Sequence, residues 1–131
     1  MTLDRTFTYR LHVLHKLTDM QTQRAYETEL GMTLSDGRCL SVIGAFGPLS
    51  VGDLASKSNL DKGQASRAAQ SLVEQSLVEK GISHSDGRGV VLTLTPKGRK
   101  LYLRVMALVE ARNEEILSPQ YERTAIAEPT L

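Results

Sequence analysis

In the middle of the chain the apolar residues change from helical spacing to the alternation of strands, and this change limits the possible folds more than any other feature. Ser50 and Asp61 each precede a short helical pattern, and both residue types are good helix N-caps. Residues 77–83 and 90–95 are then rich in β-branched residues, and the sequence HSDGRG joins them. This order predicts two short helices joined by a tight turn and followed by a β-hairpin.

Longer helical patterns flank this segment. No proline or glycine interrupts residues 6–29, where apolar residues recur at helical spacing. A further helix is predicted from Ser35 to the sequence FGPLS, where Pro48 cannot continue it. After the hairpin, Thr95 is a suitable N-cap and Pro96 suits the first helical position. The expected fold is therefore mainly α with a small β-hairpin, in the order of a winged helix-turn-helix.

The second of the two short helices has two different faces. One face is small and apolar, through Ala65, Ala68 and Leu72. The opposite face is short, polar and basic, with no acidic residue before Glu74. Such a helix can enter the major groove of DNA, where Arg and Gln read base edges; a helical hairpin with a solvated outer face is the alternative. The candidate major-groove residues are Lys62, Gln64, Ser66, Arg67 and Gln70.

The turn of the predicted hairpin carries Arg88 between two glycines, which make the bend easy. A charged side chain at an extended tip adds nothing to a core. We therefore expect Arg88 to reach the minor groove of DNA, whose narrow A·T stretches concentrate negative potential. Asp86 is expected to aim Arg88 rather than to meet phosphate itself. Further candidate phosphate contacts are His84 and Lys97 near the hairpin and the helix N-termini capped by Ser50 and Asp61.

Charge is distributed unevenly along a chain whose net charge is only +1. Residues 57–104 carry a net charge of +5, whereas residues 1–56 carry −1 and residues 105–131 carry −3. A nearly neutral chain can thus present an anion-binding face. Chance clustering on a solvated surface is the alternative interpretation.

Several functional classes are disfavoured by the sequence. The single cysteine excludes an intrachain disulfide, and the absence of a long apolar run or signal peptide indicates a cytoplasmic protein without a membrane partner. No catalytic motif is present, so we expect neither enzymatic activity nor a cofactor. His12 and His15 share a helix face but lack further ligands for a metal, and Cys39 lies in an apolar stretch typical of a core.

The order and spacing of these patterns resemble the MarR family of bacterial transcriptional regulators. The resemblance is carried by SVGDLASKSNLDKGQASRAAQSLVEQSLVEK, by SDGRGVVLTLT and by LTPKGRKL, and it extends over residues 6–117. It implies a homodimer that binds a pseudo-palindromic operator, usually as a repressor, and that is released by a small ligand. It also implies one domain over residues 1–131, in which residues 6–29 and 97–126 serve mainly dimerisation and residues 35–95 form the winged helix-turn-helix DNA-binding lobe.

The resemblance also implies roles for individual residues. Gln64, Ser66 and Arg67 would read the major groove, and Arg88 would enter the minor groove with Asp86 as its partner within the wing. An aromatic or phenolic acid would bind near the first, second and fifth helices. The candidate residues for this effector pocket are His15, Arg38 and Arg104.

Two departures from the family pattern stand out. Ser76 occupies the position after the recognition helix where the family usually has glycine, so we expect a serine in a left-handed conformation at modest cost. The apolar pattern after Pro119 is short, so the dimer is expected to depend on the first helix and on residues 105–117. Two alternative functions stay open: a winged-helix module for protein–protein contact, and a repressor that senses oxidants through Cys39.

Overall fold

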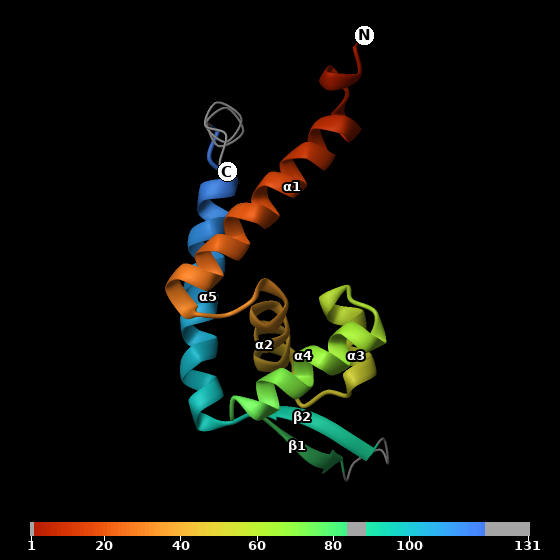
Figure 1. Ribbon diagram of the computed structural model, residues 1–131, viewed down its shortest axis with the longest axis vertical. Helices are drawn as coiled ribbons and strands as arrows, with labels where there is room; N and C mark the ends of the chain where they lie inside the picture. Colours follow the sequence, from red (N-terminus) through yellow and green to blue (C-terminus); the bar gives the residue numbers. More distant parts are fainter. Residues whose placement is uncertain (1, 84–88, 120–131) are drawn as a thin grey trace.

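The computed structural model describes residues 2–83 and 89–119 and shows a small lobe attached to two long helices (Figure 1). The lobe contains α2, α3, α4 and the hairpin of β1 and β2, and α1 rises diagonally away from it. This arrangement confirms a mainly helical chain with one antiparallel hairpin. The elements are η1 (Leu3–Arg5), α1 (Phe7–Ala25), η2 (Tyr26–Leu30), α2 (Leu34–Phe46), α3 (Val51–Ser58), α4 (Lys62–Glu74), β1 (Val78–Ser83), β2 (Gly89–Leu94) and α5 (Pro96–Ile116).

The predicted N-caps fix where the two short helices of the lobe begin. The Ser50 hydroxyl accepts a hydrogen bond from the amide of Asp53 at 3.1 Å, so α3 starts at the next residue. Asp61 and Gln64 form the predicted capping box: the Asp61 carboxylate accepts from the Gln64 amide at 2.7 Å, and the Gln64 side chain accepts from the Asp61 amide at 3.1 Å. Both caps satisfy amides that a helix terminus would otherwise leave unpaired.

The hydrophobic core lies within the lobe. Its fully buried side chains come from α2, α3, α4, the hairpin and α5, whereas α1 contributes no buried residue. A long helix without buried residues gains little from packing within its own chain. The largest fully buried side chains are Leu40, Ile43, Leu54, Leu72, Leu92, Val78, Val105 and Cys39.

The hairpin is anchored to the lobe along one of its faces. Val78 lies opposite Leu94 and Lys80 opposite Leu92 in the antiparallel register, and Leu49 extends the pairing through a bridge to Leu92. Val78 and Leu92 are fully buried, while Ile82, nearer the turn, is 69% exposed. The base of the hairpin is therefore part of the core, and its distal end projects beyond it.

Arginine side chains of α5 contact α1 and the π-helical segment that follows it. Arg112 of α5 is 91% buried, and its guanidinium donates to the side chains of Thr22 and Gln21 on α1 at 3.2 and 3.3 Å. Arg104 of α5 donates to the carbonyl oxygen of Glu29 at 2.9 Å, in the π-helical segment η2 that ends the first helix. This π-helical ending was not expected from the sequence, which predicted one continuous helix to residue 29. None of the described helices is long and apolar enough to cross a membrane.

The start of α5 packs closely against the backbone that leaves α4. Ser76 adopts the expected left-handed conformation, with φ of 62°, and its carbonyl oxygen accepts from the Thr95 hydroxyl at 2.6 Å. The Thr95 hydroxyl also caps α5 by accepting from the amide of Gly98 at 2.9 Å. A Cβ atom on Gly98 would lie only 1.9 Å from the carbonyl oxygen of Leu77. Only glycine therefore fits this position.

We predict that Gly98→Ala destabilises the protein by about 3 kcal/mol or more, because the Leu77 backbone cannot move without disturbing the junction. The matched control is Gly52→Ala in α3, where the nearest atom to an added Cβ is 3.8 Å away. There alanine should stabilise the helix by roughly 0.5–1 kcal/mol. Thermal unfolding followed by circular dichroism measures both changes, and equal midpoints for the two variants would contradict the prediction.

Candidate nucleic-acid interface

The amphipathic character predicted for α4 is present in the structure. Ala65, Ala68, Ala69 and Leu72 are all buried against the lobe, at 0–4% exposure. These short side chains bring the helix axis close to the core, so the opposite face projects outward from the lobe. The polar side chains predicted for that face are all exposed: Lys62, Gln64, Ser66, Arg67 and Gln70.

Neighbouring groups restrain two of these exposed side chains. The Gln64 side chain takes part in the capping box. Gln70 donates to Glu74 at 3.3 Å and accepts from the ammonium group of Lys80 on β1 at 3.4 Å, which links α4 to the hairpin. Side chains restrained before binding lose less conformational entropy when they bind.

A carboxylate on α2 fixes the C-terminal end of α4. Asp36 accepts hydrogen bonds from the Ser71 hydroxyl at 2.7 Å and from the side-chain Nε2 of Gln75 at 3.3 Å. A hydrogen bond to a charged group contributes about 1.5–3 kcal/mol, and partial solvent exposure here favours the lower value. Asp36 has no signal in the sequence, because it lies 35 residues before Ser71 and no local pattern connects the two.

The residues that were predicted to contact phosphate have different surroundings in the structure. Lys97 donates to the carbonyl oxygen of Gln75 at 3.1 Å, so its charge lies at the C-terminus of α4, where the helix dipole favours a cation. The Ser50 and Asp61 side chains cap α3 and α4. The wing residues His84, Asp86 and Arg88 lie outside the described residues.

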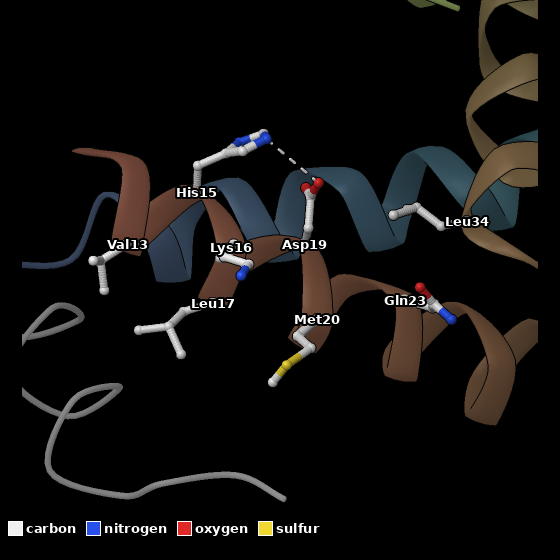
Figure 2. A pocket seen from close by; sticks show the side chains of 8 residues that line it. All are labelled: Val13, His15, Lys16, Leu17, Asp19, Met20, Gln23 and Leu34. Atoms are coloured by element: carbon white, nitrogen blue, oxygen red, sulfur yellow. Dashed lines mark ion pairs between the residues drawn. The ribbon is translucent and has the colours of Figure 1, made fainter. Parts of the chain in front are cut away.

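A separate pocket of about 570 Å³ lies beside α1 at the start of α2 (Figure 2). The carboxylate of Asp19 is its polar centre: Arg38 of α2 pairs with it at 2.8 Å, and His15, one turn earlier on α1, lies 3.5 Å from it. Figure 2 shows the His15 imidazole and the Asp19 carboxylate directed toward one another. The pocket is lined by Val13, His15, Lys16, Leu17, Asp19, Met20, Gln23 and Leu34.

Of the three residues predicted for an effector pocket, His15 lines this pocket. Arg38 is not a lining residue, but it pairs with Asp19, which is one. Arg104 is not a lining residue either, and its guanidinium donates to the carbonyl oxygen of Glu29. Asp19 was missed in the sequence, where a single carboxylate on a helix carries no distinctive signal.

Cys39 lies in the core of the lobe, as predicted, with no exposed surface. Burial raises the pKa of its thiol, although a contact with the Ser58 hydroxyl at 3.9 Å opposes this shift. A thiol kept protonated and out of solvent reacts slowly with oxidants. Within the described ranges, no three His, Cys, Asp or Glu side chains are grouped so that they could hold a metal ion.

Comparison with known proteins gives consistent similarities. The sequence model of the MarR family matches residues 30–89. An HTH-type transcriptional repressor of Mycobacterium tuberculosis is 30% identical over 89 residues, which cover 68% of this chain and 64% of the relative. The chain thus spans less than two thirds of the length of the curated relatives that it matches, and only 49% in the case of a regulator from Clostridium symbiosum.

Solved structures extend the similarity over almost the whole chain. A MarR/EmrR family regulator from Acinetobacter has a TM-score of 0.80 at 23% identity, covering 97% of this chain and 91% of its own, and shows the same fold. A MarR family protein of Mycobacterium tuberculosis, solved in complex with p-aminosalicylic acid, has a TM-score of 0.70 at 25% identity. It covers 93% of this chain and 95% of its own.

Proposed function

Because this chain belongs to the MarR family, we propose that it is a sequence-specific DNA-binding transcriptional regulator. In this proposal it acts as a homodimeric repressor on a pseudo-palindromic operator, and a small aromatic acid releases it. The observation that carries the proposal is the outer face of α4, which is polar, basic and exposed over its first turns.

The outer face of α4 suits the major groove for two reasons. Arg67 and Gln70 can each form paired hydrogen bonds with base edges, Arg with guanine and Gln with adenine. Lys62 adds positive charge in the first turn of the helix, and the first acidic residue, Glu74, comes only at its last position. The phosphate backbone therefore meets attraction and no opposing carboxylate along most of the helix.

The wing completes the proposed interface. Arg88 is proposed to enter the minor groove with Asp86 as its partner, and His84 and Lys97 are proposed to contact phosphates near the hairpin. The position of the described strands supports this, because the distal end of the hairpin projects beyond the core of the lobe. Lys80, which already links β1 to α4, would keep the wing and the recognition helix in a fixed relation.

The two long helices support the dimer. Phe7 and Leu11 of α1 are 77% and 52% exposed, and Leu103 of α5 is 61% exposed. Large apolar side chains exposed on the two long helices are costly in water and favourable between two chains. Residues 6–29 and 97–126 are therefore proposed as the main dimerisation segments. A dimer would also present two recognition helices, one for each of two DNA half-sites whose centres lie about 34 Å apart, which is one turn of DNA.

The pocket at Asp19 supports an acidic effector. His15 and Lys16 line it with basic groups, and Arg38 pairs with Asp19, the one carboxylate among its lining residues. The other lining side chains are mostly apolar. An aromatic acid matches both properties, since its ring fits the apolar walls and its carboxylate the basic groups. The complex of the Mycobacterium tuberculosis protein with p-aminosalicylic acid makes that compound the first probe to test.

We expect Arg67→Ala to weaken operator binding by about 1–3 kcal/mol, or roughly 5- to 150-fold, through loss of base or phosphate contacts. Fluorescence anisotropy with a duplex from the chain's own upstream region, beside a scrambled duplex at low and moderate salt, measures the effect. The control is Arg5→Ala in η1, an exposed residue outside the lobe and outside the proposed dimerisation segments, which should leave affinity unchanged. Equal wild-type affinity for both duplexes would favour the protein–protein module instead.

We expect Phe7→Glu to convert the dimer to a monomer, because it places a charge on the exposed apolar stripe of α1. Phe46→Glu is the matched control: Phe46 is also exposed, at 57%, but lies in the lobe over Lys57. Light scattering coupled to size exclusion gives the mass of each variant. A dimeric Phe7→Glu protein, or a monomeric wild type, would contradict the proposed interface.

We expect p-aminosalicylate to bind the wild type with measurable heat and to lower its operator affinity. Arg38→Gln should weaken ligand binding by about 10-fold or more, as the loss of a charge-assisted hydrogen bond implies. Arg104→Gln is the control, because Arg104 contacts Glu29 and not the pocket. Isothermal titration without heat across a panel of aromatic acids would remove the effector from the proposal.

A further inference from the structure

The first turn of α2 contacts three other parts of the chain within five residues. Leu34 lines the pocket beside α1, Asp36 binds α4, and Arg38 pairs with α1. Between them, Gly37 lies against the ring of Tyr26 in η2.

On the pocket side, the turn is held by one ion pair. The Arg38 guanidinium lies 2.8 Å from the carboxylate of Asp19, and both side chains are partly exposed, at 46% and 36%. An ion pair of this exposure is weak enough to exchange partners. A ligand carboxylate in the pocket would compete with Asp19 for Arg38.

On the α4 side, the contact is shorter and better shielded. The Ser71 hydroxyl donates to Asp36 at 2.7 Å in a partly buried setting, and the Gln75 side chain donates to the same oxygen of Asp36 at 3.3 Å. Ser71 and Gln75 are one helical turn apart, so Asp36 restrains the last turns of α4 from one side. A shift of Asp36 therefore requires these turns to move or the bonds to break.

The turn itself has little room to deform. A Cβ atom on Gly37 would lie 2.2 Å from the ring of Tyr26, which is only 2% exposed. Closely packed groups transmit a displacement rather than absorb it. A change at Arg38 is thus passed to Asp36, two residues earlier on the same turn.

We propose that Asp36 is a positioning residue for the recognition helix, and that the first turn of α2 transmits the state of the Asp19 pocket to α4. The biological role of this coupling rests on the proposed function, because it links the effector pocket to the DNA-binding face. The coupling itself joins two sites of the free protein and can be measured without DNA or ligand.

Hydrogen exchange of the free protein, followed by mass spectrometry, tests the coupling. Asp19→Ala removes the partner of Arg38 and should speed exchange of the amides at residues 72–77 by about two- to fivefold, the scale of one partly exposed ion pair. Glu27→Ala is the matched control: it also removes a carboxylate, but one bound by Gln23 of the preceding turn rather than by α2. It should leave residues 72–77 unchanged.

The same measurement in an Asp36→Ala background separates transmission from simple loss of structure. Asp36→Ala removes both hydrogen bonds to α4, from Ser71 and from Gln75, so Asp19→Ala should then add little further exchange at residues 72–77. Unchanged exchange in the single Asp19→Ala variant, or an equal effect of Asp19→Ala in both backgrounds, would overturn the inference. Failure of operator binding would overturn the proposed function and leave this result intact.

Discussion

The contact of Gly98 with the carbonyl oxygen of Leu77 sets the geometry on which the other elements depend. It lets the first turn of α5 lie directly on the chain leaving α4, with Thr95 and Lys97 bonded to the carbonyl oxygens of Ser76 and Gln75. The exposed face of α4 is thereby held at a fixed angle to the long helix. In the proposed dimer, whose contacts are the long helices, this backbone junction would also set the separation of the two α4 helices.

The lobe and the two long helices are stabilised by different interactions. The lobe is stabilised by a hydrophobic core, in which Leu40, Leu54 and Leu92 are fully buried. The long helices are held together by polar contacts, above all the buried guanidinium of Arg112, while α1 buries no side chain. An isolated helix of this kind is only marginally stable in water. Association of two chains would supply the apolar burial that the single chain lacks.

Features that depend on neighbours in sequence could be predicted, and features that depend on distant contacts could not. The caps at Ser50 and Asp61 act over three residues, and the two faces of α4 follow from helical periodicity, so both were evident before the structure. The Asp36–Ser71 bond joins residues far apart, and the binding of Arg104 to Glu29 rather than to the pocket depends on how α5 crosses η2. Neither leaves a local pattern. The contacts of the wing tip at Arg88 remain a prediction.

The alanine face of α4 has a consequence for how such a protein can change. Ala65, Ala68 and Ala69 carry the packing of the helix, while the outward side chains of Ser66 and Arg67 contribute nothing to the core. Substitutions on the outer face therefore cost little stability. Under the proposed function, a lineage could acquire a new operator preference by replacing a few exposed residues, with no compensating mutation inside the lobe. Folding and sequence recognition are then free to evolve separately on opposite sides of one helix.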